Sequence, residues 1–97
     1  EAIDYVVKLN GKAFEDQCRS YPEAQKALLI AIAKEGKADS INSIAFSRKH
    51  SLKSPSTVQS AARTLYEKEV ITKAGTSYRI NNRFFSIWLD NLYGSRH

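Results

Sequence analysis

The fold is decided by the stretch Ser54-Pro55-Ser56-Thr57-Val58-Gln59-Ser60-Ala61-Ala62-Arg63-Thr64-Leu65-Tyr66-Glu67-Lys68-Glu69-Val70-Ile71-Thr72-Lys73. Its first residues predict a helix start, because Ser54 can accept a hydrogen bond from a first-turn N–H and Pro55 occupies the helical position where a missing N–H costs nothing. The apolar residues then share one helical face: Val58, Ala61, Ala62, Leu65 and Tyr66. We therefore expect a helix over about residues 55–69 that packs on this face and exposes a polar one.

Two short strands follow this helix. Val70-Ile71-Thr72-Lys73 and Ser77-Tyr78-Arg79-Ile80 are rich in β-branched and aromatic residues, and Ala74-Gly75-Thr76 separates them. This pattern predicts a hairpin over about residues 70–80 with a small tip. Beyond it, apolar residues at helical spacing predict a closing amphipathic helix with a buried aromatic seam: Phe84, Phe85, Ile87, Trp88, Leu89, Leu92 and Tyr93.

A long helix is predicted upstream, opening at Pro22 and ending at Gly36. It is apolar around most of its circumference, which is typical of a central element. Residues 1–19 predict two shorter helices, because Asn10-Gly11 interrupts their apolar pattern.

A short helix is predicted between these two regions. Residues 37–39 read as a polar connection, after which Ser40 can cap a helix that ends near Lys49. Its predicted inward face consists of Ile41, Ile44, Ala45 and Phe46.

The order of these elements indicates the fold class. Two short helices joined by a tight link at residues 50–54 form a helix-turn-helix unit. We therefore expect a mainly α fold with a small β-hairpin, namely a winged helix-turn-helix with an extra N-terminal helix or helices and a C-terminal amphipathic helix. The helix over residues 55–69 is then the recognition helix, and the hairpin is the wing.

Size and charge narrow the function. A chain of 97 residues is one domain by length, and its formal net charge is +5. The segment 1–33 has four Lys and Arg against five Asp and Glu, whereas the segment 34–97 has eleven against five. The positive charge therefore accompanies the recognition helix. It favours nucleic acid as a partner, although a basic isoelectric point is also common among small domains.

Three further features bear on the setting of the chain. Cys18 is the single cysteine, so no internal disulfide can form, and we expect a reducing, cytoplasmic environment. No apolar run approaches the roughly 20 residues of a membrane helix, so no membrane partner is expected. The chain begins at Glu1 and contains no methionine, which indicates a piece excised from a longer protein.

Catalytic chemistry has little support in the sequence. The four glycines are scattered singly and form no phosphate-binding loop. The acidic pairs Glu15/Asp16 and Glu67/Glu69 read as solvated carboxylates. His50 and His97 have no metal-ligand or triad partner at a recognisable spacing, so we expect both at the surface. We expect no enzymatic activity and no metal or cofactor in this piece of the protein.

Nucleic-acid binding has more support. In a helix-turn-helix unit the N-terminal part of the second helix enters the major groove, and flanking basic groups hold phosphates. Gln59 can pair bidentately with adenine, and Arg63 with guanine or a phosphate. The expected nucleic-acid-binding set lies before the helix, on its polar face and in the wing: Lys49, His50, Lys53, Ser56, Thr57, Gln59, Ser60, Arg63, Thr64, Lys73, Thr76, Ser77 and Arg79.

The same residues also fit an ordinary exposed surface or a protein contact. Gln59 and Arg63 can simply decorate a solvated helix. Glu67 and Glu69 reduce the positive charge at the far end of the recognition helix, and the wing tip Ala74-Gly75-Thr76 carries no Lys or Arg. The residues themselves therefore leave both interpretations open.

Four segments carry a family resemblance: Pro22-Glu23-Ala24-Gln25-Lys26-Ala27-Leu28-Leu29-Ile30-Ala31-Ile32-Ala33-Lys34-Glu35-Gly36, Ser56-Thr57-Val58-Gln59-Ser60-Ala61-Ala62-Arg63-Thr64-Leu65-Tyr66-Glu67-Lys68-Glu69-Val70-Ile71, Tyr78-Arg79-Ile80 and Phe84-Phe85-Ser86-Ile87-Trp88-Leu89. Together they resemble the C-terminal winged-helix domain of prokaryotic AAA-type ATPases. Many winged helices share the Val-Gln-x-Ala-x-x-x-Leu pattern, and the Phe-Phe-x-Ile-Trp-Leu helix narrows the resemblance to the ATPases. Glu69 departs from many relatives, which have glycine there to turn the chain sharply into the wing.

The resemblance implies a non-catalytic, DNA-binding winged helix over residues 21–97, with residues 1–20 as the end of a preceding helical lid or linker. ATP and Mg²⁺ would bind only in a missing upstream domain, so the parent protein would be the ATPase. Double-stranded DNA is the implied partner. The alternative is a protein-interaction module that packs on the ATPase domain or a neighbouring subunit and couples nucleotide state to assembly.

Overall fold

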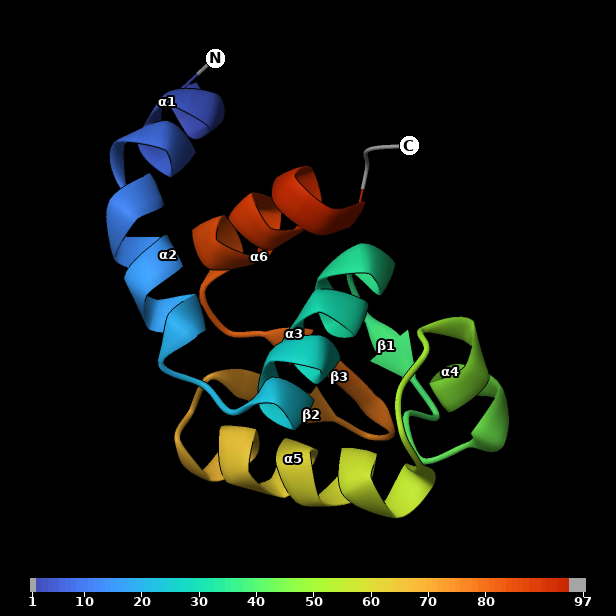
Figure 1. Ribbon diagram of the computed structural model, residues 1–97. Helices are drawn as coiled ribbons and strands as arrows, with labels where there is room; N and C mark the ends of the chain where they lie inside the picture. The colour runs from blue at the N-terminus through green and yellow to red at the C-terminus, as the bar shows by residue number, and fades with distance from the viewer. Residues whose placement is uncertain (1, 95–97) are drawn as a thin grey trace.

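The computed structural model describes residues 2–94 of the chain, as drawn in Figure 1. The elements in chain order are α1 (Ala2–Leu9), α2 (Gly11–Arg19), α3 (Glu23–Glu35), β1 (Ala38–Asp39), α4 (Ile44–Lys49), α5 (Pro55–Glu67), β2 (Ile71–Ala74), β3 (Ser77–Ile80), α6 (Arg83–Leu89) and the π-helical turn η1 (Asp90–Gly94). The interpretations of His97 and of the Tyr93 side chain lie outside what is described. The fold is mainly helical with a small antiparallel sheet, which confirms the expected winged-helix class.

Helix α3 is the centre of the fold, as the sequence predicts. In Figure 1 it lies between α5 on one side and α6 on the other. Leu28, Leu29 and Ile32 are fully buried, and α3 contacts α5, α6 and β3. Gly36 ends the helix with a φ of 75°, a left-handed backbone that glycine adopts at little cost.

Helix α5 begins as predicted, with the Thr57 N–H donating to the Ser54 hydroxyl at 3.2 Å and Pro55 in the first turn. Its buried face consists of Val58, Ala61, Ala62 and Leu65. The prediction that Tyr66 shares this face is wrong, because Tyr66 is 52% exposed. At about 100° per residue, Tyr66 lies roughly a quarter-turn from the middle of the buried stripe.

The sheet has one strand more than expected. The sequence predicts a polar connection over residues 37–39, but Ala38 and Asp39 form β1 and pair antiparallel with Tyr78 and Ser77. The strand order is β1-β3-β2, and Ala38 is buried. A strand of two residues is too short to show a periodic pattern. Its pairing depends on residues far away in the sequence.

Helix α4 starts later than predicted. Ser40 has a φ of 53°, and Ser43 caps the helix instead by accepting a hydrogen bond from the Phe46 N–H at 3.0 Å. In the helix that Ser43 caps, the buried residues are Phe46 and Ser47. Ile44, predicted to face inward, is 61% exposed. Ala45 is exposed as well, whereas Ile41 is buried just ahead of the helix.

Helix α2 packs against the closing helix α6. The Phe14 ring lies 5.5 Å from that of Phe85 and 6.1 Å from that of Trp88, between ring centroids, and Cys18 is also part of the core. Within the predicted seam Phe85 and Leu89 are buried, whereas Leu92 is exposed. The domain boundary near residue 20 stays a prediction.

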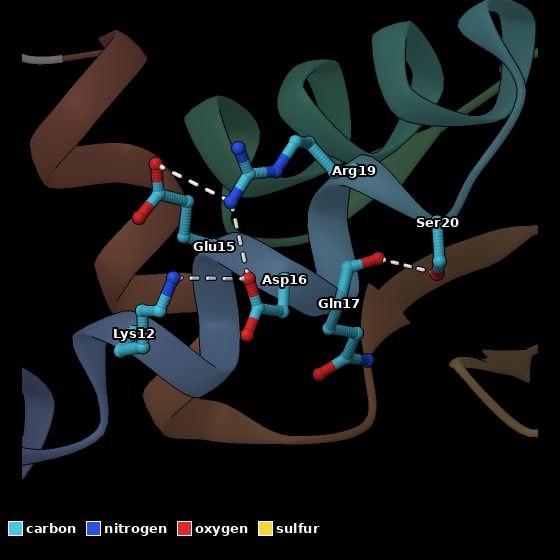
Figure 2. Close-up of polar contacts among 6 residues, drawn as sticks. All are labelled: Lys12, Glu15, Asp16, Gln17, Arg19 and Ser20. Carbon is cyan, nitrogen blue, oxygen red and sulfur yellow. Dashed lines mark hydrogen bonds and ion pairs between the residues drawn. The ribbon is translucent and has the colours of Figure 1, made fainter.

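The outer face of α2 carries exposed ion pairs. Figure 2 shows the Arg19 guanidinium beside Asp16 and Glu15, and the Lys12 ammonium beside Asp16. The Arg19 nitrogen lies 3.1 Å from an Asp16 oxygen and 3.8 Å from a Glu15 oxygen, and the Lys12 nitrogen lies 3.6 Å from Asp16. Each such exposed pair contributes about 0.3–0.5 kcal/mol. The aromatic contacts of Phe14, and not these ion pairs, therefore hold α2 in place.

The turn from α5 into the wing is sharp, although Glu69 stands where many domains of the resembled family have glycine. Glu69 adopts a φ of 64°. Its N–H donates to the Tyr66 carbonyl at 3.0 Å, and the Val70 N–H donates to the Leu65 carbonyl at 2.9 Å. These two bonds form a Schellman motif, which normally ends in glycine. Ser51, with a φ of 57°, takes the same position after α4.

The contrast between adjacent residues of α5 gives a stability test. Leu65→Ala removes a fully buried side chain and is expected to destabilise the domain by about 2–5 kcal/mol. Tyr66→Ala truncates an exposed side chain and is expected to cost less than about 1 kcal/mol. Denaturant unfolding of both variants measures the difference, and equal losses would contradict this assignment of the two faces.

Glu69 gives a second test. A left-handed conformation costs a non-glycine residue about 1–2 kcal/mol. Replacing that residue by glycine removes this strain, but glycine loses more backbone entropy on folding, which costs about 0.5–1 kcal/mol. Glu69→Gly is therefore expected to raise the free energy of unfolding by up to about 1 kcal/mol. The matched control is Lys68→Gly, at a φ of −84°, which is expected to lower it by about 0.5–1 kcal/mol. Destabilisation by Glu69→Gly would rule out a strained residue 69.

Candidate nucleic-acid interface

The polar face of α5 forms an exposed ridge of small residues and one cation. Ser56, Ser60 and Arg63 are all exposed and lie within about 60° of one another around the helix axis. Gln59 is also exposed, and it lies on the same side of the helix as Tyr66, which is two turns further along. Because Tyr66 lines a groove beside β2, Gln59 lies on the wing side of the ridge.

The opposite side of the ridge borders the start of α3. A groove of about 330 Å³ runs between the two helices. Its lining residues are Pro22, Ala24, Gln25, Ser56, Thr57, Ser60, Ala61 and Thr64. Two of the hydroxyls also bond within the helix: Thr57 Oγ1 accepts from Ser54 at 3.0 Å, and Thr64 Oγ1 donates to the Ser60 carbonyl at 3.3 Å.

Gln25 is the groove residue that sequence reasoning missed. Its Oε1 atom is buried and has no hydrogen-bond partner within the described residues. Nothing in the local sequence marks it, since Gln25 meets α5 only through the packing of α3 against that helix.

The two wing cations lie on opposite faces of the hairpin. Lys73 pairs with Tyr78 in the strand register, and Thr72 pairs with Arg79. Because successive side chains of a strand alternate in direction, Lys73 shares a face with Tyr78 and Arg79 shares one with Thr72. The Lys73 ammonium lies 5.6 Å from the Tyr78 ring centroid. The structure therefore does not bring these two charges onto one surface.

The two polar wing residues also differ in role. Thr76 is exposed at the hairpin tip. Ser77 donates a hydrogen bond from its hydroxyl to the Asp39 carboxylate, which ties β3 to β1. Ser77 is thus engaged inside the sheet, and Thr76 is the hydroxyl presented outward.

The basic residues ahead of α5 also differ in exposure. Lys53 is exposed. His50, expected at the surface, has a side chain only 6% exposed. Its Nε2 lies 2.7 Å from Glu35 Oε2, and its ring centroid lies 4.7 Å from that of Phe46. The surface prediction for His50 is wrong, because this histidine ties α4 to the end of α3.

Lys49 shares the same acceptor. Its ammonium lies 2.9 Å from Glu35 Oε2, although most of the lysine side chain is exposed. The hydrogen bond from Lys49, followed by that from His50, lowers the pKa of the Glu35 carboxyl below its ordinary value. Lys49 is therefore an exposed cation that already has an internal counter-charge.

The lowered pKa of Glu35 predicts a pH-dependent stability. Because the carboxyl is more acidic in the folded chain, its contribution is complete above the ordinary glutamate pKa and is lost as the pH falls through the lowered value. From about pH 6 to about pH 3, the melting temperature is expected to fall more steeply for the wild type than for Glu35→Gln. The exposed Glu23→Gln variant is the control, and parallel curves for wild type and Glu35→Gln would contradict the role given to Glu35.

Other kinds of site find no support in the described part of the chain. Among the side chains that the structure describes, no group of three or more His, Cys, Asp or Glu is placed to hold a metal ion. No helix within residues 2–94 has the length and apolar character needed to cross a membrane.

One comparison with known proteins agrees with the fold described above. A family model described as a probable winged helix domain matches residues 12–91, from α2 through α6. No curated protein and no solved structure matches the chain. Winged-helix domains are generally non-catalytic, and no catalytic family is indicated. The chain belongs to the family of probable winged helix domains.

Proposed function

We propose that this domain binds double-stranded DNA, with the N-terminal half of α5 in the major groove. The observation that carries the proposal is the ridge formed by Ser56, Ser60 and Arg63, with Gln59 beside it. These side chains lie outside the core and are exposed on a rigid, capped helix. In Figure 1 α5 forms one side of the molecule, away from α1 and α6, so the described elements leave its outer face open.

The side chains divide by the chemistry they offer. Arg63 and Gln59 present fork-shaped donors and acceptors that suit guanine and adenine edges. The hydroxyls of Ser56, Thr57, Ser60 and Thr64 suit phosphate oxygens, and small side chains let the helix approach the bases closely. Gln25 adds a carboxamide at the border of the same surface.

Charge sets the direction in which the helix approaches. Lys53 lies just before its first turn, whereas Glu67 and Glu69 lie at its end. DNA phosphates are attracted to the end of α5 near Lys53 and are repelled by the end near Glu67 and Glu69. The N-terminal half therefore enters the groove and the C-terminal end tilts away. Lys49 and one wing cation, Lys73 or Arg79, then contact the flanking backbone.

The resemblance described above supports a wider proposal about the parent protein. We propose that the domain is part of a cytoplasmic AAA-type ATPase whose upstream domain binds ATP and Mg²⁺. The exposed side chains of Tyr5 and Leu9, one turn apart on α1, favour a protein contact at that end of the domain. Contact with the ATPase domain or a neighbouring subunit is the second candidate role, and it uses the end opposite α5.

The DNA proposal is tested with the purified chain and fluorescent duplexes. On the tightest duplex selected from a random pool, Arg63→Ala is expected to cost roughly 1–3 kcal/mol and to relax the base preference. Lys53→Ala is expected to weaken binding on all duplexes alike and to reduce the salt slope by about one. The control is Lys12→Ala, an exposed cation on α2, which should change neither quantity.

Two results would contradict this assignment. One is the absence of salt-sensitive binding by the wild-type chain at low ionic strength. The other is an effect of Lys12→Ala on the salt slope as large as that of Lys53→Ala, which would indicate attraction by overall charge alone.

A further inference from the structure

A second groove lies between the end of α5 and the first strand of the wing. It has a volume of about 490 Å³ and is open to solvent. Its lining residues are Tyr66, Glu67, Glu69, Ile71, Thr72, Lys73 and Asn81. The DNA proposal uses the N-terminal half of α5 and, among the residues of this groove, at most the Lys73 side chain.

The groove carries two carboxylates that are not neutralised. Glu67 and Glu69 are both exposed, and neither forms an ion pair with any residue in the described range. The nearby ammonium of Lys73 lies over the Tyr78 ring instead. Two free carboxylates in one groove attract a cationic partner.

The turn at Glu69 holds this residue directly before the first strand of the wing. Glu69 stands in the left-handed position that ends a Schellman motif, where glycine costs less. Asn81 further fixes the turn by donating from Nδ2 to the Glu69 carbonyl at 3.1 Å. Glu67 and Glu69 therefore line the same groove.

The wall of the groove opposite α5 is a free strand edge. Strand β2 is the outer strand in the order β1-β3-β2, so within the described residues its other side has no partner strand. The two-residue loop Gly75-Thr76 makes Ala74 and Ser77 a hydrogen-bonded pair. Alternation along the ladder then directs the N–H and C=O groups of Ile71 and Lys73 outward, where they can bind another strand.

Tyr66 supplies the third element of recognition. Its ring is half exposed at the edge of the groove. An exposed aromatic ring beside two carboxylates suits the aliphatic stem and the charged head of a lysine or arginine.

We propose that this groove binds an extended, cationic segment of a partner protein, which adds to the sheet as a strand along β2. Main-chain groups of the segment pair with Ile71 and Lys73, and its lysine or arginine side chains meet Glu67, Glu69 and Tyr66. Because alternate residues of a strand face the same side, the segment carries its cations at every second position. Lys73 is the residue that both proposals name: its main chain pairs with the segment here, whereas its side chain is one of the two wing cations offered to the DNA backbone.

The test uses a fluorescent peptide that alternates lysine and valine, titrated with the whole chain. Wild-type protein is expected to bind it and not the matching peptide that alternates glutamate and valine. Methylating the backbone amides on one edge of the lysine peptide is expected to weaken binding about 10-fold or more, because it removes strand pairing but keeps the charge. Among backbone amide NMR signals, those of Ile71 and Lys73 should shift most.

Variants of the carboxylates complete the experiment. Glu67→Gln and Glu69→Gly are each expected to weaken peptide binding about 2- to 5-fold. Glu69→Gly leaves the left-handed turn accessible, so its loss of binding does not reflect unfolding. Glu23→Gln removes an exposed carboxylate at the start of α3 and should leave the affinity unchanged.

Three outcomes would overturn the proposal. The first is no binding of the lysine peptide by the wild type. The second is binding that amide methylation does not weaken, or that shifts amides elsewhere than in β2. The third is tighter duplex DNA binding by the two variants with no change in peptide affinity, which would mean that the carboxylates only repel phosphates.

Discussion

The fold depends on the burial of α3 against elements on several of its sides. Leu28, Leu29 and Ile32 are completely removed from solvent, and each such side chain contributes about 1.5–3 kcal/mol relative to an exposed one. The surfaces that cover them come from α5, β3 and α6, which are separated in the sequence but meet on this one helix. Helix α5 is one of several elements that cover α3, and it packs on α3 with a single face. Its polar ridge therefore lies outside the core.

The ends of two helices then set the directions of the functional elements. Ser51 after α4 and Glu69 after α5 both adopt left-handed backbones in Schellman motifs. The first turn aims α5 across α3, and the second returns the chain as β2 alongside α5. Each turn uses a residue less suited to it than glycine, so local strain of about 1 kcal/mol is outweighed by the packing on either side.

Charge is distributed along α5 and its surroundings in a way that separates two surfaces. The start of the helix has Lys53 and a ridge of hydroxyls with Arg63, whereas its end has two unneutralised carboxylates beside a free strand edge. One end therefore suits an anionic partner and the other a cationic one. The proposed DNA and peptide sites use different halves of one helix, so the domain has room for both partners.

The sequence by itself determined the elements whose signals are local. Ser54 and Pro55 mark the start of α5, Gly36 marks the end of α3, and Gly75 lies in the hairpin loop, because caps and turns depend on neighbouring residues. Only the tertiary structure decided the pairing of β1 with β3, the burial of His50 against Glu35, the place of Gln25 in a groove and the exposure of Tyr66. Each of these depends on contacts between residues far apart in the chain or on the exact rotation of a helix. Periodicity fixes that rotation too coarsely to tell the edge of a buried stripe from its centre.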